Sequence, residues 1–295
     1  MTGHLSGSIL ALAGIFYAAA FLLHLLSFFG VWGHGHRPGF FFMRIGFLFG
    51  TFYFVTEAFE HGYFLPVVHL SQAMAFFAWS LAFVYLVFLV RIQSESFGIF
   101  LTPILLFLVA VSLVSASPSG DIQKVVQANP VLRSPYFALH IVSAFFAYAS
   151  FALSFVAGIL YLIQHYELKH RSPGTFYHKL PSLEQLEKLI YQPITWGTVL
   201  LCTALAVGFL WSKSASGEFW IREPKTLLTA ATIVLYLLIL FLRHGISLRS
   251  SRVVFLSVLV FGVVVFSFFG GRFFQGHHNF LTSPSSSAPM PYGVS

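Results

Sequence analysis

The chain has 295 residues, of which 57% are hydrophobic and only 8% are charged; an average soluble domain has about 25% charged residues. So few charges cannot cover a water-soluble fold of this length, which argues against a soluble helical bundle and indicates that the apolar surface faces lipid. The net charge of +7 comes from Lys and Arg scattered through short loops. This pattern fits anionic membrane lipid and gives no sign of a nucleic-acid partner.

Eight stretches are apolar and long enough to cross a bilayer, which takes about 20 residues. They cover residues 8–30, 40–59, 66–90, 98–116, 136–165, 193–211, 226–243 and 252–271. The first has no Lys or Arg before it and no small-residue cleavage site, which favours a retained helix over a removed signal peptide. We therefore expect an all-α, polytopic transmembrane helix bundle over residues 1–281. A Ser- and Pro-rich tail over 282–295 is predicted to be disordered.

Eight spans place both termini on one side of the membrane. On that side we count six Lys and Arg residues: Lys124, Arg133, Lys213, Arg222, Lys225 and Arg272. The other side has ten: Arg37, Arg44, Arg91, Lys169, Arg171, Lys179, Lys188, Arg243, Arg249 and Arg252. The positive-inside rule then predicts that the second group is cytoplasmic and that both termini lie outside, as in a multi-pass plasma (inner) membrane protein.

Two segments between the spans have distinctive patterns. Residues 181–190 carry Leu and Ile on one helical stripe with charges opposite, and Ser182 with Gln185 forms a capping box. This pattern predicts a short helix lying at the cytoplasmic membrane interface before the sixth span. The outer loop 211–225 is polar and aromatic at once, and Pro224 occupies the favoured proline position at the start of the next helix.

Thirteen histidines are many for so hydrophobic a chain. Five of them lie in cytoplasmic turns and loops, where a solvated surface role is expected: His34, His36, His165, His170 and His178. His24 lies within the first span, where a polar group is costly unless it is paired. We therefore expect His24 to face the bundle, as a hydrogen-bonded structural residue more readily than as a ligand.

The predicted topology brings three features to the outer surface. His140 lies at the outer end of the fifth span, His277 and His278 follow the eighth, and the aromatic loop 211–225 opens on the same face. A shared metal or haem site is one interpretation. The competing interpretation is a set of surface histidines beside an interfacial aromatic belt.

Haem suits these residue types, because neutral imidazoles can hold iron from its two axial faces. Flat apolar contact for a porphyrin is available from Trp211, Phe219 and Trp220. The propionates have cationic candidates in Arg222, Lys225, Arg133 and Arg272. Zinc is favoured less, because no carboxylate or thiol completes a four-ligand set at recognisable spacing. Signatures of nucleophilic hydrolysis and of phosphate-binding loops are absent from the sequence.

The sequence resembles the cytochrome c assembly proteins, which comprise the CcsA group and its HemX-like relatives, over about residues 46–280. The outer loop of that family reads approximately W-A-x-x-A-W-G-x-Y-W-x-W-D-P-K-E. The positions that match are Trp211, Ala215, Gly217, Trp220, Pro224 and Lys225, with Phe219 for the tyrosine and Glu223 for the aspartate. Ser216 and Arg222 replace two tryptophans, and Thr226 replaces the final glutamate, so the motif is degenerate.

The flanking segments resemble the family more closely. Residues 132–140 resemble the stretch that ends at the family's first external haem histidine, which falls on His140. Residues 276–280 resemble G-L-H-S-Y, which carries the second and selects His278 over His277. The segment 181–191 is similar to the family's P-S-L-E-x-L stretch.

The resemblance implies haem as the cofactor, held through His140 and His278 at the extracytoplasmic face and presented to an apocytochrome c. It also implies a cofactor-binding set made of the two histidines with Trp211, Gly217, Phe219, Trp220, Glu223, Pro224 and Lys225. Catalytic residues are not implied. Full synthases work with a second, CcsB-like membrane subunit, so the chain is expected to be a component of a haem lyase and not an enzyme alone.

The sequence departs from the family at two further positions, both within predicted spans. Full members have two further histidines inside the membrane, and these fall on Gly50 and Phe241. Their loss favours an alternative, a HemX-like non-catalytic regulator of haem biosynthesis. A third class, a transporter for another solute, would need polar residues along a pore-lining face. Its candidates are His24, Glu57, Glu60 and Gln72.

Overall fold

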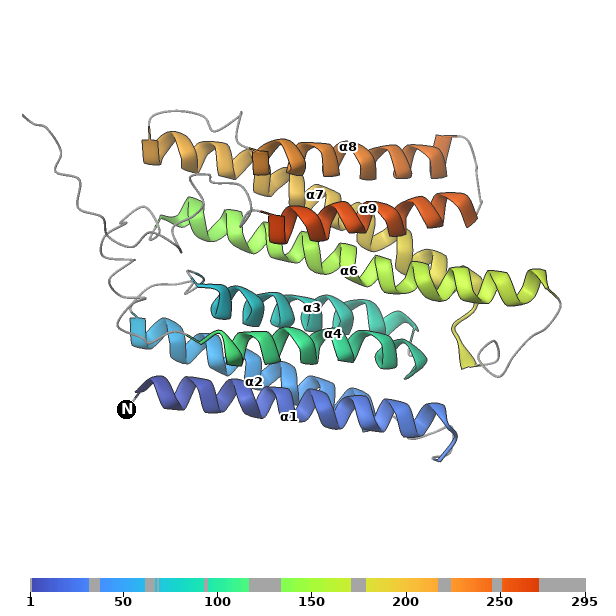
Figure 1. Cartoon of the computed structure of the whole chain (residues 1–295), viewed down its shortest axis with the longest axis horizontal. Coiled ribbons are helices and arrows are strands. Elements are labelled where there is room, and N and C mark those ends of the chain that lie inside the picture. Colours follow the sequence, from blue (N-terminus) through green and yellow to red (C-terminus); the bar gives the residue numbers. More distant parts are fainter. Residues whose placement is uncertain are drawn as a thin grey trace, which may run out of the picture.

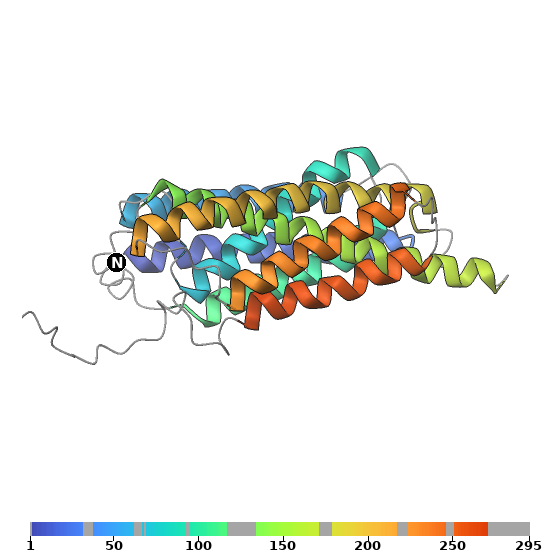
Figure 2. The same cartoon turned by 90° about the horizontal axis from the view of Figure 1, so that it is seen from above.

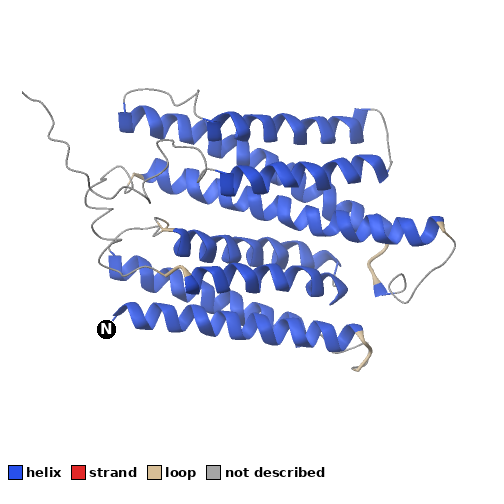
Figure 3. Ribbon diagram, in the orientation of Figure 1, coloured by secondary structure: helices blue, strands red, loops and turns tan. Residues whose placement is uncertain are grey.

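The computed structural model describes residues 2–31, 38–61, 67, 69–92, 95–116, 134–170, 179–216, 224–245 and 251–270. Within these ranges the chain forms long helices without strands, as Figure 3 shows. The helices are α1 (Thr2–Phe28), α2 (Pro38–His61), α3 (Leu70–Ile92), α4 (Glu95–Val114), α6 (Pro135–Lys169), α7 (Leu183–Ser216), α8 (Pro224–Gly245) and α9 (Ser251–Gly270). Each predicted span falls on one of them, which confirms the all-α helix bundle.

Seven of the described helices are long and apolar enough to cross a membrane, so the chain is a multi-pass membrane protein. In α9 the apolar stretch with described side chains runs from Ser251 to Val265, which is shorter than a full span. Successive helices run in opposite directions, and the start of α1 lies at the same end of the bundle as the end of α9 (Figures 1 and 2). We call this the His140 end, and the opposite one the Arg243 end.

The bundle has two halves. One contains α1 to α4 and the other α6 to α9, and α6 connects them through contacts with α3 and α4 (Figure 1). Aromatic rings fill much of this junction: the ring centroids of Phe76 and Phe145 are 5.3 Å apart, and those of Trp79 and Phe146 are 5.9 Å apart. Edge-to-face ring pairs of this kind favour a fixed arrangement of the two halves.

The most extensive contact between helices joins α6 and α7. Glycines allow their close approach: a Cβ at Gly197 would lie 2.7 Å from Cε1 of Phe151, and one at Gly208 would lie 2.9 Å from Nδ1 of His140. Small residues have this role in membrane helix pairs, where packing itself drives association. The α6–α7 pair is therefore the frame on which His140 is held.

The predicted helix at 181–190 exists, but its separation from the sixth span is wrong. α7 runs without a break from Leu183 through Pro193 to Ser216. The reason is burial: Leu186, Leu189 and Ile190 are at most 3% exposed and pack into the bundle core instead of lying along the membrane surface. The helix therefore continues as one rigid element.

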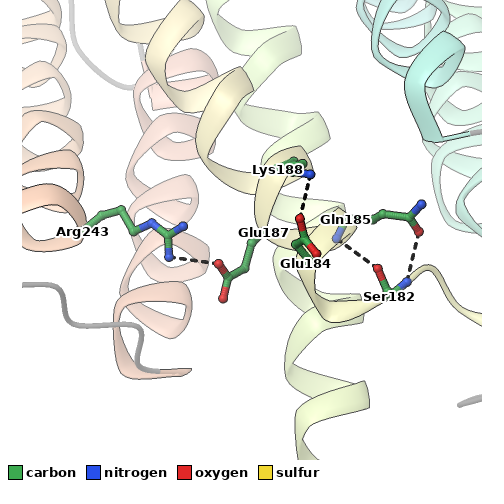
Figure 4. Close-up of polar contacts among 6 residues, drawn as sticks. All are labelled: Ser182, Glu184, Gln185, Glu187, Lys188 and Arg243. Carbon is green, nitrogen blue, oxygen red and sulfur yellow. Dashed lines mark hydrogen bonds and ion pairs between the residues drawn. The ribbon is translucent and has the colours of Figure 1, made fainter.

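The capping box at the start of α7 is confirmed (Figure 4). The backbone N–H of Ser182 donates to Oε1 of Gln185 at 3.1 Å, and that of Gln185 donates to Oγ of Ser182 at 3.3 Å. These bonds satisfy two backbone donors that the first turn leaves without helical partners. Just before this cap, Nζ of Lys179 donates to the carbonyl oxygen of Phe28 and lies 4.8 Å from its ring centroid. This contact ties the end of α1 to the start of α7.

Candidate functional site

His140 lies in the second turn of α6, and the local sequence explains its place. Ser134 is the N-cap, its Oγ accepting the backbone N–H of Tyr136 at 3.2 Å, and Pro135 takes the first helical position. Both are favoured helix-start signals, so the helix begins at a defined residue. Phe137 and His140 then lie three positions apart on one face of α6.

The imidazole of His140 rests against α7. Its Nδ1 lies 2.7 Å from the carbonyl oxygen of Ala204. Its ring is nearly parallel to the indole of Trp211, with centroids 6.3 Å apart and an interplanar angle of 17°. Phe137 packs on the same indole at 5.3 Å, and Trp211 is only 2% exposed. Two of the predicted site residues, His140 and Trp211, are therefore in one cluster at the His140 end.

Ala204, Gly208 and Trp211 are spaced by four and three residues and form one stripe on α7. The first accepts the imidazole hydrogen bond, the second leaves room for the ring, and the third covers it. The sequence predicted Trp211 as a site residue but gave no prediction for Ala204 and Gly208. The sequence signal for them was weak, because alanine and glycine are common along apolar helices.

The other predicted site residues are only partly described. Pro224 starts α8, as predicted, and Lys225 follows in its first turn, its carbonyl oxygen accepting Oγ1 of Thr229 at 2.9 Å. The end of α7 and the start of α8 thus bring the two edges of the aromatic loop to the His140 end. Outside the described residues lie Gly217, Phe219, Trp220, Glu223, His277 and His278, and also Arg133, Arg222 and Arg272.

One described residue at this end, His140, could serve as an axial ligand of haem iron. Among the described residues, no group of three or more His, Cys, Asp or Glu side chains could hold a metal ion. A zinc site takes three or four such ligands, whereas a haem iron needs a single imidazole on each axial face. His140 is a suitable axial donor, since its Nδ1 is engaged by a carbonyl and aromatic rings lie beside it.

Comparison with known proteins identifies the family of this chain. The profile of the family described as "Cytochrome C assembly protein" matches residues 67–278. The chain belongs to this family. It is 30% identical over 254 residues to protein HemX of Brevibacillus brevis, a match that covers 86% of this chain and 91% of the relative. It is 27% identical over 241 residues to the cytochrome c biogenesis protein CcsA of Guillardia theta, covering 76% and 79%.

A second HemX protein, from Bacillus subtilis, is 25% identical over 258 residues, with 86% of this chain and 91% of the relative covered. The chain is thus a multi-pass membrane protein of the cytochrome c assembly family, with relatives among both the HemX and the CcsA proteins. The family match ends at residue 278 and contains His140 and the whole 211–225 loop.

Gly50 and Phe241, which the sequence resemblance placed at the family's intramembrane histidines, differ in their surroundings. A Cβ at Gly50 would lie 3.3 Å from Cδ1 of Trp79 and 3.9 Å from the hydroxyl of Tyr17, so aromatic side chains fill the space beside it. Phe241 is 62% exposed on α8. Neither Gly50 nor Phe241 has a side chain that can ligate iron.

His24 faces the bundle, as predicted, and is fully buried. A Cβ at Gly39 of α2 would lie 2.5 Å from its Nδ1, and a Cβ at Gly98 of α4 would lie 2.5 Å from its Nε2. Phe40 contacts the ring at 5.0 Å with an interplanar angle of 65°. Helices α2 and α4 thus enclose the imidazole of His24 against α1, which leaves no room for a porphyrin.

Two of the four polar residues considered for a transport path, Glu57 and Gln72, pair with each other. Nε2 of Gln72 donates to Oε2 of Glu57 at 3.0 Å, and both side chains are buried. Oε1 of the same Gln72 accepts the backbone N–H of His69 at 3.3 Å. A buried carboxylate needs such donors to offset its desolvation. These contacts tie α2 to α3 at the His140 end and give Glu57 and Gln72 a structural role.

The Arg243 end has its own polar contacts (Figure 4). Nη1 of Arg243 on α8 lies 3.0 Å from Oε2 of Glu187 on α7, and its guanidinium carbon lies 4.4 Å from the ring centroid of Tyr191. Only about a fifth of each side chain of this ion pair is exposed. The pair therefore fixes the end of α8 to the start of α7, at the opposite end of the bundle from His140.

Proposed function

We propose that this protein holds haem as cargo at the His140 end of the bundle. His140 takes one axial position of the iron and His278 the other. The segment 211–225, which contains the end of α7, the connection and the start of α8, holds the porphyrin edge through Trp211, Gly217, Phe219, Trp220, Glu223, Pro224 and Lys225. The haem is then presented to an apocytochrome c or passed to a partner membrane subunit of the CcsB type.

The observation that carries this proposal is the environment of His140. A backbone carbonyl engages one ring nitrogen and buried aromatic rings stand beside the imidazole, which are the features of a histidine prepared to ligate a metal through its other nitrogen. The family relationship supports haem as that metal group. We infer from the Lys and Arg distribution that this end faces away from the cytoplasm.

A direct test measures the optical spectrum of the protein purified in detergent and mixed with haemin. We expect a low-spin, bis-histidine Soret spectrum for the wild type and for His277→Ala. The spectrum should become high-spin in His140→Ala and in His278→Ala, and haemin binding should be lost when both are replaced. A bis-histidine spectrum that persists in the His140→Ala/His278→Ala double variant would exclude the assigned ligands.

The proposal also requires that His140 and His278 lie on the same side of the membrane. With Cys202, the single cysteine of the chain, replaced by serine, new cysteines at Ala138 and Asn279 can be labelled with a membrane-impermeant maleimide in intact cells. Both sites should react from the same, extracytoplasmic side. Labelling of the two from opposite sides would mean that His140 and His278 cannot bind one iron atom.

A regulatory role like that implied for HemX-like relatives is the second candidate. It is favoured by two observations: the match covers 91% of the HemX sequence of Brevibacillus brevis, and Gly50 and Phe241 stand where the sequence resemblance places the intramembrane histidines of full members. Gene deletion separates the two functions. Loss of mature c-type cytochromes supports assembly, whereas altered tetrapyrrole levels with normal cytochromes support regulation.

A further inference from the structure

The backbone of α7 approaches His140 more closely than a side chain would permit. An ideal Cβ at Gly208 would lie 2.9 Å from Nδ1 of His140 and 3.0 Å from its Cε1. Real Cβ atoms essentially never come this near to ring atoms, so the present position of the imidazole requires glycine at 208. The ring edge that contacts Gly208 is the same edge that hydrogen-bonds to Ala204.

The hydrogen bond to Ala204 determines the protonation of the ring. A backbone carbonyl can only accept, so at 2.7 Å the Nδ1 of His140 must carry the proton and donate it. A neutral imidazole has one protonated nitrogen and one lone pair, which here resides on Nε2. Ala204 is 1% exposed, so its carbonyl is shielded from competing water.

We propose that Gly208 and the Ala204 carbonyl form a cradle that selects the tautomer and orientation of His140, and that Gly208 is a positioning residue for this ligand. The proposal extends the proposed function, because the cradle makes Nε2 the ligating atom. A carbonyl bonded to Nδ1–H raises the basicity of the opposite nitrogen, and loss of such a partner typically lowers metal affinity about 10- to 100-fold. The cradle therefore sets how tightly the iron is held.

The first test needs no haem and no substitution in the cradle itself. The protein is labelled with 15N-histidine, and His140 is assigned by comparison with His140→Ala. The 15N chemical shifts then report which ring nitrogen carries the proton. We expect Nδ1 to be protonated and Nε2 unprotonated at neutral pH in the haem-free wild type. The opposite tautomer, or an equal mixture, would overturn the cradle whether or not the protein binds haem.

The second test replaces Gly208 by alanine. The added methyl group must push the imidazole from Ala204, so we expect a mixture of tautomers and a haemin dissociation constant raised about 10- to 100-fold. Gly197→Ala is the matched control: on the same helix its Cβ would lie 2.7 Å from Phe151, an equally tight contact remote from His140. It should lose stability but keep the wild-type tautomer and affinity.

The outcomes separate the two proposals. A wild type that has the expected tautomer but does not bind haemin contradicts the proposed function and leaves the cradle standing. A Gly208→Ala protein with the tautomer and haemin affinity of the wild type contradicts the cradle and leaves the proposed function standing. If Gly208→Ala does not fold, the tautomer of His140 in the wild-type protein still decides whether the cradle exists. Equal loss of affinity in Gly208→Ala and Gly197→Ala would reduce Gly208 to a packing residue and overturn its positioning role.

Discussion

The two halves of the bundle each place a histidine against helix glycines, and the two arrangements differ in enclosure. His24, in the first half, is fully buried between Gly39 and Gly98 and touches two other helices, α2 and α4. His140, in the second half, lies near the start of α6, meets Gly208 among the described glycines, and remains partly accessible. A histidine in an apolar helix is therefore structural when neighbouring helices pack on both sides of its imidazole ring. It is a candidate ligand when one nitrogen is anchored and the other edge lies near the bundle end.

The sharpest test of this contrast removes His24. Its ring is enclosed on all sides, so His24→Ala should leave a cavity and lower the free energy of unfolding by about 2 to 5 kcal/mol, as for other large-to-small core changes. Denaturant titration in detergent measures this loss. Haemin binding by the folded fraction should stay unchanged, whereas His140→Ala should show the reverse pattern. Loss of haemin binding in His24→Ala would break the distinction between the two histidines.

A smaller effect is expected from Gly98→Ala. Its Cβ would lie 2.5 Å from Nε2 of a ring that has no space to shift, and overpacking of this kind costs about 1 to 3 kcal/mol. Gly262→Ala is the control, since nothing lies within 4 Å of its Cβ. That variant should gain up to about 1 kcal/mol from helix propensity. Thermal melting in detergent compares the two, and equal melting temperatures would contradict the enclosure of His24.

The Gly50→His variant tests whether an added histidine in the first half of the bundle can bind haem iron. The space next to Gly50 is occupied by Trp79 and Tyr17, so we expect a loss of about 1 to 2 kcal/mol from overpacking and no additional haemin bound. Haemin stoichiometry measured by pyridine haemochrome analysis checks this. A second bound haemin would show that the aromatic junction can open around a new ligand.

The smallest effect is expected at Phe241, which is 62% exposed. Phe241→Ala should change the free energy of unfolding by no more than about 0.5 kcal/mol, because an exposed position on the bundle leaves no cavity. Tyr236→Ala on the same helix is the contrast, since Tyr236 is 1% exposed and stacks on Phe151 with centroids 4.0 Å apart. Similar losses in both variants would mean that Phe241 is covered by a partner.

Much of the helix framework could be predicted from the sequence, because its signals are local. Apolar runs of membrane length located the helices, Ser182 with Gln185 marked the start of α7, and Pro224 marked the start of α8. The break expected before residue 193 was wrong. Periodicity showed that one stripe of 183–190 is apolar, but it could not tell lipid from protein as the partner of that stripe.

The sequence by itself determined that this is a helical membrane protein, where α7 and α8 begin, and that His140 and Trp211 lie at the same end. Tertiary structure alone decided that Gly208 faces an imidazole, Gly197 faces Phe151 and Gly262 faces open space. These glycines are alike in the sequence. The physical reason is that their roles depend on how two helices meet, and the contact between helices is set by the packing of many residues at once.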